Sequence, residues 1–135
     1  MSKEYDETFD WKGMAAKVMK HSFDFEGKKV TFANPEYNRH ADSALQMDVL
    51  VDGKKQSILN YSPQVDLETI HVEVTTPGSK EPPSIYRFYG DTPEAIEAGL
   101  IMSTEHATES QLYRNSDTAK ADYKVLRKPA PRLKS

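Results

Sequence analysis

One segment near the middle of the chain constrains the fold more than any other. Every second residue in it is apolar, and a strand places alternate side chains on the same face, so a strand buried on one face is expected. These apolar positions are Leu45, Met47, Val49 and Val51. Asp52-Gly53 follows at once and favours a two-residue hairpin turn, because both central residues of a type I′ turn need positive φ. The sequence therefore predicts an antiparallel hairpin whose return strand covers residues 55–61.

The same alternation recurs on both sides of this hairpin. Short strands are expected at residues 23–25 and 30–32, joined by a turn at Glu26-Gly27. Further strands are expected at residues 69–75 and 85–89. Asn34-Pro35 is expected to end the second strand, since proline donates no ladder hydrogen bond and restricts the residue before it. Residues 36–42 are then expected to form a loop.

Two helices are expected to flank these strands. Asp10 is a plausible N-cap for a helix from Trp11 to His21 with a short apolar stripe. The run Asp91-Thr92-Pro93-Glu94 has the composition of a second helix start. Residues 95–102 are apolar on most sides, so this part is expected to be covered on two sides, with Gly99 allowing a close approach. Residues 103–120 are compatible with helix, and residues 123–126 with a late strand.

Consecutive strands joined by short turns predict the α+β class. We expect an antiparallel meandering sheet of roughly six strands, with an N-terminal and a C-terminal helix packed on it. A partly closed barrel has the same pattern. The length of 135 residues suits one domain, which we place at residues 1–122. Residues 123–135 are interpreted as an extended, basic, proline-containing C-terminal arm.

The distribution of charge separates this arm from the rest. Residues 1–115 carry a net charge of −7, whereas residues 116–135 carry +4. The basic residues of the arm are Lys124, Arg127, Lys128, Arg132 and Lys134. Such an arm can reach an acidic surface, either on a second copy or on another protein, and phosphate groups of a nucleic acid are an alternative partner. A solubilising tail without a partner is the third interpretation.

Composition excludes several classes of function. The chain has no cysteine, so a disulfide framework, a thiolate metal site and a cysteine nucleophile are excluded. The longest apolar run, around Leu100–Met102, is far too short to cross a bilayer, so no membrane partner is expected. The acidic N-terminus does not resemble a signal peptide. A reducing cytoplasmic compartment, or the interior of an assembled particle, is therefore expected.

One group of residues could recognise a ligand. His71 and Glu73 lie two apart in a predicted strand and therefore share a face, where the carboxylate could fix the imidazole tautomer. Arg87 and Tyr89 lie in the aromatic strand at residues 85–89, which could also stack nucleic-acid bases. An ordinary solvated sheet face explains the same pattern. His71, Glu73, Arg87 and Tyr89 are thus candidate binding residues for a small anionic molecule or a partner protein.

Candidates for metal binding are weaker. His106 has Glu105 and Glu109 at helical spacing, and His40 has Asp42 nearby, but neither pair completes a ligand set. A helix surface pair explains His106 and Glu109 equally well. We therefore assign no metal, no cofactor and no catalytic residue, and an enzyme built on His71 or His106 is the least favoured interpretation.

These observations predict a non-catalytic structural or interaction protein that acts in a homo-oligomer or a larger assembly. Small proteins whose terminal arms grip their neighbours are common in virus particles, so a virus-particle or viral accessory component is one expectation by analogy. The alternative is a ligand-binding or inhibitory module that uses the sheet face around His71 and Arg87.

Overall fold

The N-terminal helix follows directly from its sequence. The computed structural model describes residues 10–37, 44–63, 69–90 and 92–117, and its first element is helix α2, Trp11–Lys20. The carboxylate of Asp10 caps the helix by accepting a hydrogen bond from the backbone N–H of Gly13 at 3.0 Å. The apolar stripe is buried and consists of Trp11, Met14, Ala15 and Val18. The predicted helix is confirmed.

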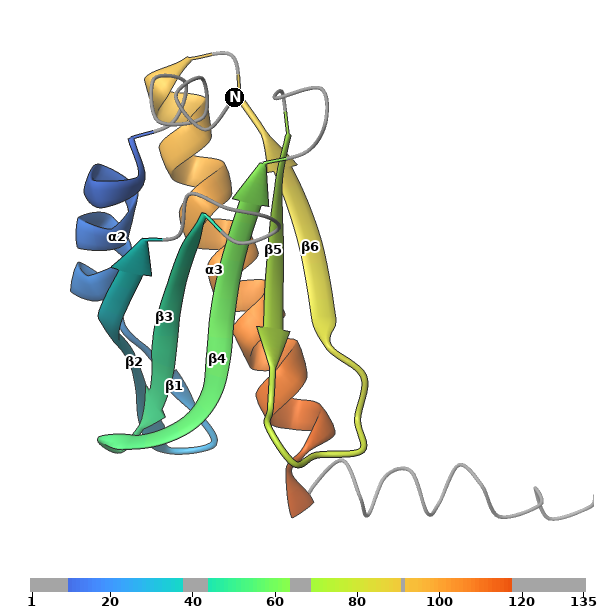
Figure 1. Ribbon diagram of the computed structural model, residues 1–135. Coiled ribbons are helices and arrows are strands. Elements are labelled where there is room, and N and C mark those ends of the chain that lie inside the picture. Colours follow the sequence, from blue (N-terminus) through green and yellow to red (C-terminus); the bar gives the residue numbers. More distant parts are fainter. Residues whose placement is uncertain (1–9, 38–43, 64–68, 91, 118–135) are drawn as a thin grey trace, which may run out of the picture.

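Six strands form one antiparallel sheet in which strand order equals chain order. In that order they are β1 Phe23–Phe25, β2 Lys28–Tyr37, β3 Leu45–Val51, β4 Lys54–Pro63, β5 Thr69–Thr75 and β6 Ser84–Tyr89. The sheet curls into a half-barrel, with the long helix α3, Pro93–Arg114, along its concave side and α2 beside it against β2 (Figure 1). The predicted α+β class and meandering sheet are confirmed.

Both predicted hairpin turns are present. Asp52 and Gly53 have φ values of 50° and 82°, and Glu26 and Gly27 have φ values of 50° and 79°. Two successive residues with positive φ define the type I′ family, whose twist matches that of the flanking strands. The β3–β4 pair also contains a bulge, because Val49 is opposite Ser57 whereas Leu50 is opposite Lys55.

The prediction that Asn34-Pro35 ends the second strand is wrong. Strand β2 continues to Tyr37 and contains both residues. The register between β2 and β3 shifts between Ala33 and Glu36, and Asn34 adopts a φ of 57°. A bulge leaves residues unpaired, so it accommodates a proline that cannot donate to the ladder. Glu36 and Tyr37 therefore belong to a strand, and residues 38–42 of the expected loop lie outside the described residues.

The start of helix α3 agrees with the prediction from its sequence, but the burial of its first half does not. The hydroxyl of Thr92 accepts a hydrogen bond from the N–H of Ala95, and Pro93 occupies the first turn. Gly99 lies against Phe88, as expected for a close approach: an added Cβ would be 2.8 Å from the ring atom Cδ2. The expectation that residues 95–102 are covered on two sides is wrong, because Met102 is exposed.

The face of α3 that meets the sheet is largely polar. Its buried residues include Ser103, Thr104, Thr108 and Gln111, as well as Leu100, Ala107 and Leu112. Hydrogen bonds to the sheet compensate for the burial: Thr104 bonds the hydroxyl of Tyr61, and Gln111 accepts a hydrogen bond from Ser84 at 2.9 Å. The inner side of the helix therefore has no continuous apolar stripe, and Tyr113 near its end is exposed.

Two predictions fall on residues that the structure does not describe. The late strand at residues 123–126 and the basic arm at residues 123–135 both lie outside the described ranges. Within those ranges, neither helix combines the length and the apolar character that crossing a bilayer requires.

Candidate functional site

The predicted pair His71 and Glu73 lies on the outer face of the sheet, the face turned away from α3. Residues of β5 alternate between buried and half-buried, so Ile70, Val72 and Val74 enter the core while the pair faces outward. Nε2 of His71 lies 3.5 Å from Oε1 of Glu73. The prediction that the two side chains share a face is confirmed.

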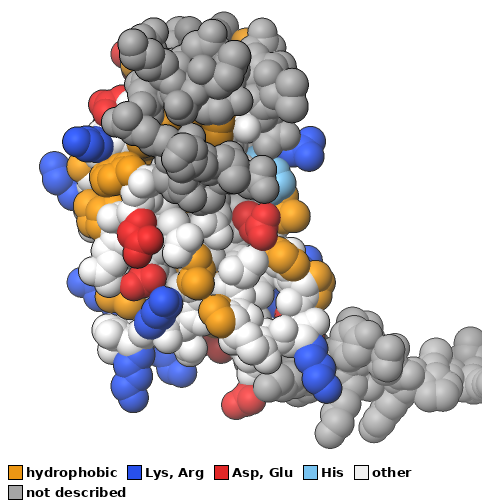
Figure 2. Space-filling view, in the orientation of Figure 1, with side chains coloured by type: hydrophobic (Ala, Val, Ile, Leu, Met, Phe, Trp, Pro, Cys, Tyr) orange, Lys and Arg blue, Asp and Glu red, His pale blue; other side chains and the backbone are white. Residues whose placement is uncertain are grey.

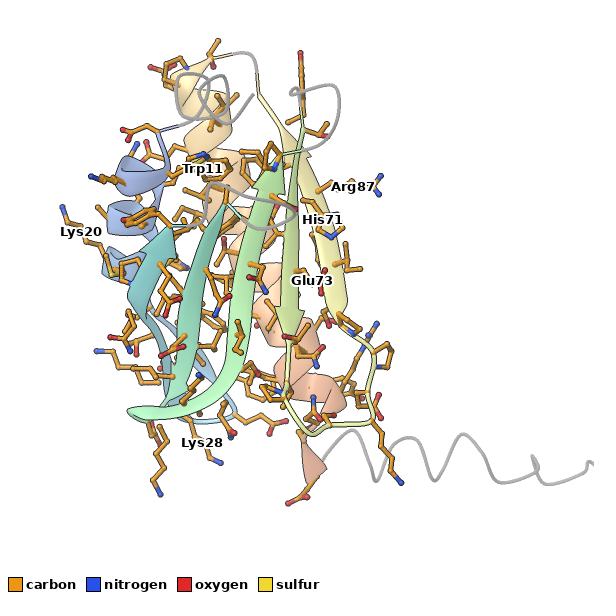
Figure 3. All side chains as sticks on the ribbon, viewed as in Figure 1. Trp11, Lys20, Lys28, His71, Glu73 and Arg87 are labelled. Carbon is orange, nitrogen blue, oxygen red and sulfur yellow. The ribbon has the colours of Figure 1, made fainter. Side chains whose placement is uncertain are left out.

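Arg87 and Tyr89 join this pair through the register of β6. His71 is directly opposite Arg87, and Thr69 is directly opposite Tyr89. Because opposite residues of an antiparallel pair project from the same face, all four candidate residues come together on the outer face of β5 and β6. Figure 3 shows His71 and Glu73 on β5, with Arg87 extending from β6 beyond the sheet edge.

Two of the four side chains in this cluster are largely open to solvent. Arg87 and Tyr89 are exposed, and His71 and Glu73 are half-buried. Neither the pocket between α2 and α3 nor the pocket at the end of α3 includes any of the four residues. Small-molecule sites bury most of their ligand, so this geometry favours contact with a broad surface over enclosure of a small anion.

Strand β6 is an edge of the sheet. It pairs with β5, and no strand among the described residues pairs with its other side. Its large side chains are nevertheless exposed: Ile85 by 49%, Tyr86 by 41% and Tyr89 by 56%. Natural edge strands are usually protected from pairing by lysine, proline or a bulge. Arg87 is the one charged residue in β6, and the strand contains neither lysine nor proline.

Helix α3 adds a second row of exposed residues along this edge. The ring of His106 stacks on that of Tyr86, with centroids 5.8 Å apart and planes inclined by 29°. Met102 and Tyr113 are four residues before and seven residues after His106, so they lie on the same side of the helix, and Met102 is 59% exposed. Hydrophobic side chains (orange) follow the right-hand margin in Figure 2, where β6 runs.

We call this region the edge surface. It comprises Ile85, Tyr86, Arg87 and Tyr89 of β6 and Met102, His106 and Tyr113 of α3. The guanidinium of Arg114 fixes α3 to the segment that precedes β6, because it donates to the carbonyl oxygens of Pro82 and Pro83 at 3.2 and 3.4 Å. Helix and strand therefore present their exposed rows as one unit.

The aromatic strand does not form a base-stacking platform. Tyr86 and Phe88 share the inner face, where Phe88 is buried, whereas Tyr89 is on the outer face beside Arg87. A stacking platform needs several aromatic rings on one exposed face. The arrangement found here supplies one exposed ring on each face.

The other candidate residues separate in space. Glu105 bonds His21 instead of His106, with Oε1 and Nε2 2.8 Å apart. His71 is on the outer face of the sheet, on the opposite side from His106. In the described parts of the chain, no three side chains of His, Asp or Glu are grouped as a metal site would require. His40, Asp42 and the arm residues Lys124, Arg127, Lys128, Arg132 and Lys134 lie outside the described residues.

The sequence did not predict that α3 contributes to the edge surface. The spacing of Met102, His106 and Tyr113 places them on one side of a helix, and this spacing is the pattern that could have indicated it. That signal was ambiguous, because the same spacing usually marks the buried side of a helix.

Comparisons with known proteins leave the function open. No protein-family model matches the chain, and neither a curated protein nor a solved structure matches it.

Proposed function

We propose that this chain is a non-catalytic interaction protein that associates with a second copy of itself through the edge surface. The observation that carries the proposal is the outer edge of β6, which pairs with no strand in the part of the chain that the structure describes and whose Ile85, Tyr86 and Tyr89 side chains are large and exposed. An uncovered edge with apolar side chains is a template for pairing with another strand.

A two-fold antiparallel pairing of β6 with β6 of a second copy suits the sequence of the strand. Centring it on Arg87 would place two guanidinium groups directly opposite, which is unfavourable. If the two-fold axis passes through Tyr86, Arg87 of the second copy lies directly opposite Ile85 in the new strand pair. Within one copy, Ile85 lies directly opposite Glu73 of β5. The carboxylate and the guanidinium are then in one row, two strands or about 10 Å apart at the Cα atoms, a span that their long side chains bridge.

Helix α3 enlarges this contact beyond a single strand. Stable interfaces bury about 1,200–2,000 Å² in total, more than one short strand supplies. Because His106 stacks on Tyr86, the α3 row of each copy adjoins the pairing axis, and Met102 and Tyr113 add apolar surface on the inner side. The dimer would therefore have a strand layer and a helix layer.

The basic arm has an electrostatic role in this proposal. Its five cationic residues follow a part of the chain with a net charge of −7, so an arm from one copy is attracted to the acidic surface of another. Assembly into a larger particle, with viral particles as one setting, is compatible with such an arm by analogy alone.

Absolute mass by light scattering tests the proposal. We expect the full-length chain to have a mass of twice 15.3 kDa at micromolar concentration. Ile85→Lys should convert it to a monomer, because a lysine on an edge strand blocks pairing. Met19→Lys is the matched control, since Met19 is also an exposed apolar residue but lies on α2, away from the edge surface. A dimer that tolerates Ile85→Lys would overturn the proposal.

A second candidate function follows from His71 opposite Arg87. These two side chains could contact an anionic group on a partner protein. A wild-type chain that is monomeric at all salt concentrations would favour this alternative, and Arg87→Ala should then abolish capture of an acidic partner while circular dichroism stays unchanged.

A further inference from the structure

A pocket lies between α2 and the first turns of α3, on the side of α3 away from β6 (Figure 1). It has a volume of about 280 Å³. Four of the side chains that line it are apolar, namely Met14, Pro93, Ile96 and Leu100. Met14 and Leu100 are buried and form its floor, whereas Pro93 is exposed at its rim. The pocket can therefore take up an aliphatic side chain, whose removal from water is favourable.

The rim of this pocket is acidic. Asp10 and Glu97 line it and are exposed, and Lys17 is the one basic residue among the described residues that line it. Nζ of Lys17 lies 3.3 Å from Oε1 of Glu97, but the two side chains are 49% and 51% exposed, and so open an ion pair contributes little. A carboxylate can accept several hydrogen bonds, so Glu97 can bond a second cation. The rim thus suits an apolar segment that is flanked by basic residues.

The C-terminal arm of the chain contains a segment of this composition. Residues 124–128 read KVLRK, so Leu126 has a valine beside it and basic residues on both sides. The arm lies outside the described residues, and Leu126 is twelve residues beyond Arg114, the last residue of α3. Twelve extended residues span up to about 40 Å.

The symmetry of the proposed dimer brings this arm to the pocket of the second copy. A two-fold axis between antiparallel strands is perpendicular to the sheet, so it reverses the direction of α3. With the axis at Tyr86, His106 lies close to it, because the two rings stack. At about 1.5 Å per residue, Arg114 is roughly 12 Å from His106 toward one end of α3, and Glu97 is roughly 14 Å from it toward the other. After the rotation, Arg114 of one copy and Glu97 of the other are therefore at nearly the same height.

The distance across the dimer is also within reach of the arm. Helix α3 packs on β5 and β6, so the two α3 helices would be about 10 Å apart, which is two strand spacings. A helix diameter of about 10 Å then separates the arm from the pocket on the far side of the second α3. The path of about 20 Å is half the extended length of the arm up to Leu126. The pocket of the arm's own chain is more distant along the helix, about 26 Å back from Arg114 to Glu97.

We propose that the basic arm of each copy docks in the pocket between α2 and α3 of the other copy. Leu126 occupies the apolar floor, and its basic neighbours within residues 124–128 contact Asp10 and Glu97. This inference rests on the proposed dimer and adds a second contact to it. Once the β6 strands have paired, the arm is held near its pocket, so even a weak contact raises the affinity of the dimer.

Disulfide trapping tests this contact directly, because the chain has no cysteine of its own. Full-length Val125→Cys is mixed with full-length Lys17→Cys, which keeps both acids of the rim, and air oxidation is followed by non-reducing electrophoresis and mass spectrometry. We expect a disulfide between residues 125 and 17 of different chains, with a mass of twice 15.3 kDa. Met19→Cys is the matched control, since Met19 is exposed on the same helix but does not line the pocket. It should react at least tenfold more slowly than Lys17→Cys.

Substitutions in the arm identify the side chain that docks. Leu126→Asp, added to the Val125→Cys chain, should slow the reaction about tenfold, because a carboxylate would meet an apolar floor and an acidic rim. Leu133→Asp makes the same change of charge in the same arm and should leave the rate nearly unchanged. Equal effects of the two substitutions would show that only the net charge of the arm matters and would overturn the assignment of Leu126.

The remaining outcomes separate other occupants of the pocket. Equal rates at positions 17 and 19 would overturn the proposal. A chain that carries both Lys17→Cys and Val125→Cys should form a covalent dimer, and closure of its disulfide within one chain would instead assign the arm to its own pocket. No bond between positions 125 and 17 would leave the pocket to another segment, such as residues 1–9, which directly precede Asp10. Light scattering of the same samples distinguishes the two proposals: a dimer without this bond refutes only the arm contact, whereas a monomer refutes the dimer as well.

Discussion

The hydroxyl groups of Tyr61 and Thr104 share a hydrogen bond in the centre of the core, where β4 faces α3. Both residues are fully buried. One strand and one helix are thus joined by two polar atoms that have no contact with solvent. Since each group satisfies the other, removing one leaves a buried polar atom unsatisfied.

Replacement of Thr104 by valine should destabilise the fold. Valine has the shape of threonine but leaves the Tyr61 hydroxyl without its partner, and an unsatisfied buried hydroxyl costs about 1–3 kcal/mol. Urea denaturation followed by circular dichroism should show a free energy of unfolding lower by that amount. Tyr61→Phe combined with Thr104→Val should recover part of the loss, because both polar atoms are then gone.

Thr108 provides the matched control, one turn further along the same helix. It is fully buried, and its Oγ1 has no hydrogen-bond partner among the described residues. Thr108→Val removes an unsatisfied polar atom, so we expect unchanged stability or a gain of up to about 1 kcal/mol. Equal losses for the two valine variants would contradict the hydrogen-bond pattern.

Tyr61 also predicts a loss of stability at alkaline pH. Burial raises its pKa well above the ordinary value of 10, and the hydrogen bond with Thr104 offsets this only in part. The stabilisation is complete below pH 10, the pKa of the unfolded chain, and is lost as pH rises above it, because only the unfolded state then releases the proton. At pH 11 the free energy of unfolding should be lower by roughly 1 kcal/mol because of Tyr61.

The measurement compares wild type with Tyr61→Phe by urea denaturation at pH 8 and pH 11. Lysines and exposed tyrosines affect both proteins equally, so the difference between them isolates Tyr61. We expect wild type to lose about 1 kcal/mol more than the variant between the two pH values. Parallel losses would show that Tyr61 titrates normally.

A side chain at position 99 should destabilise the fold. A Cβ there would lie 2.8 Å from Cδ2 and 3.0 Å from Cβ of Phe88, and Phe88 is buried, so its ring has little room to move. Alanine is favoured over glycine in a helix by about 1 kcal/mol. Overpacking typically costs 1–3 kcal/mol, so Gly99→Ala should on balance destabilise by about 1 kcal/mol.

A double-mutant cycle with Phe88→Ala separates the two effects. Alanine at position 88 lacks the Cγ and Cδ2 atoms that would lie 3.1 and 2.8 Å from the new Cβ, so most of the crowding is removed and the helix preference remains. Gly99→Ala should therefore be less unfavourable in that background than in the wild type. Thermal or urea unfolding of the four proteins provides the comparison. If Gly99→Ala is equally unfavourable with alanine at position 88, Phe88 does not set the limit.

Strong local signals predicted most of the fold. Alternation in β3 and β5, the turn at Asp52-Gly53 and the caps Asp10 and Thr92 each have a local physical cause and were found where expected. The bulge that lets β2 continue past Pro35 depends on pairing with β3, so the sequence of β2 alone could not show it.

The sequence predicted the strand residues of the candidate site but not the helix residues beside them. Alternation placed His71 and Glu73 on one face, but their neighbours depend on the register between β5 and β6. The inner side of α3 is polar because Thr104 and Gln111 find partners on the sheet, so hydropathy could not identify it. Without that orientation, Met102 and His106 could not be assigned to the exposed side.

A charge exchange across the proposed dimer tests its register. In the pairing centred on Tyr86, Arg87 of one copy shares a row with Glu73 of the other. Arg87→Glu would place two carboxylates in that row, and we expect the dimer dissociation constant to rise by about tenfold or more at low salt. Glu73→Arg alone should have a similar effect, while Glu73→Arg combined with Arg87→Glu should restore most of the affinity.

Sedimentation equilibrium of the four proteins at low salt measures this cycle. Lys55→Glu is the control: Nζ of Lys55 lies 3.3 Å from Oδ1 of Asp48, so the change breaks an ion pair on the sheet away from β6 and should leave the dissociation constant unchanged. If the double exchange remains as weak as the single variants, the strands pair in another register. In that case Glu73 serves its own chain by contacting His71, at 3.5 Å, and not the second copy.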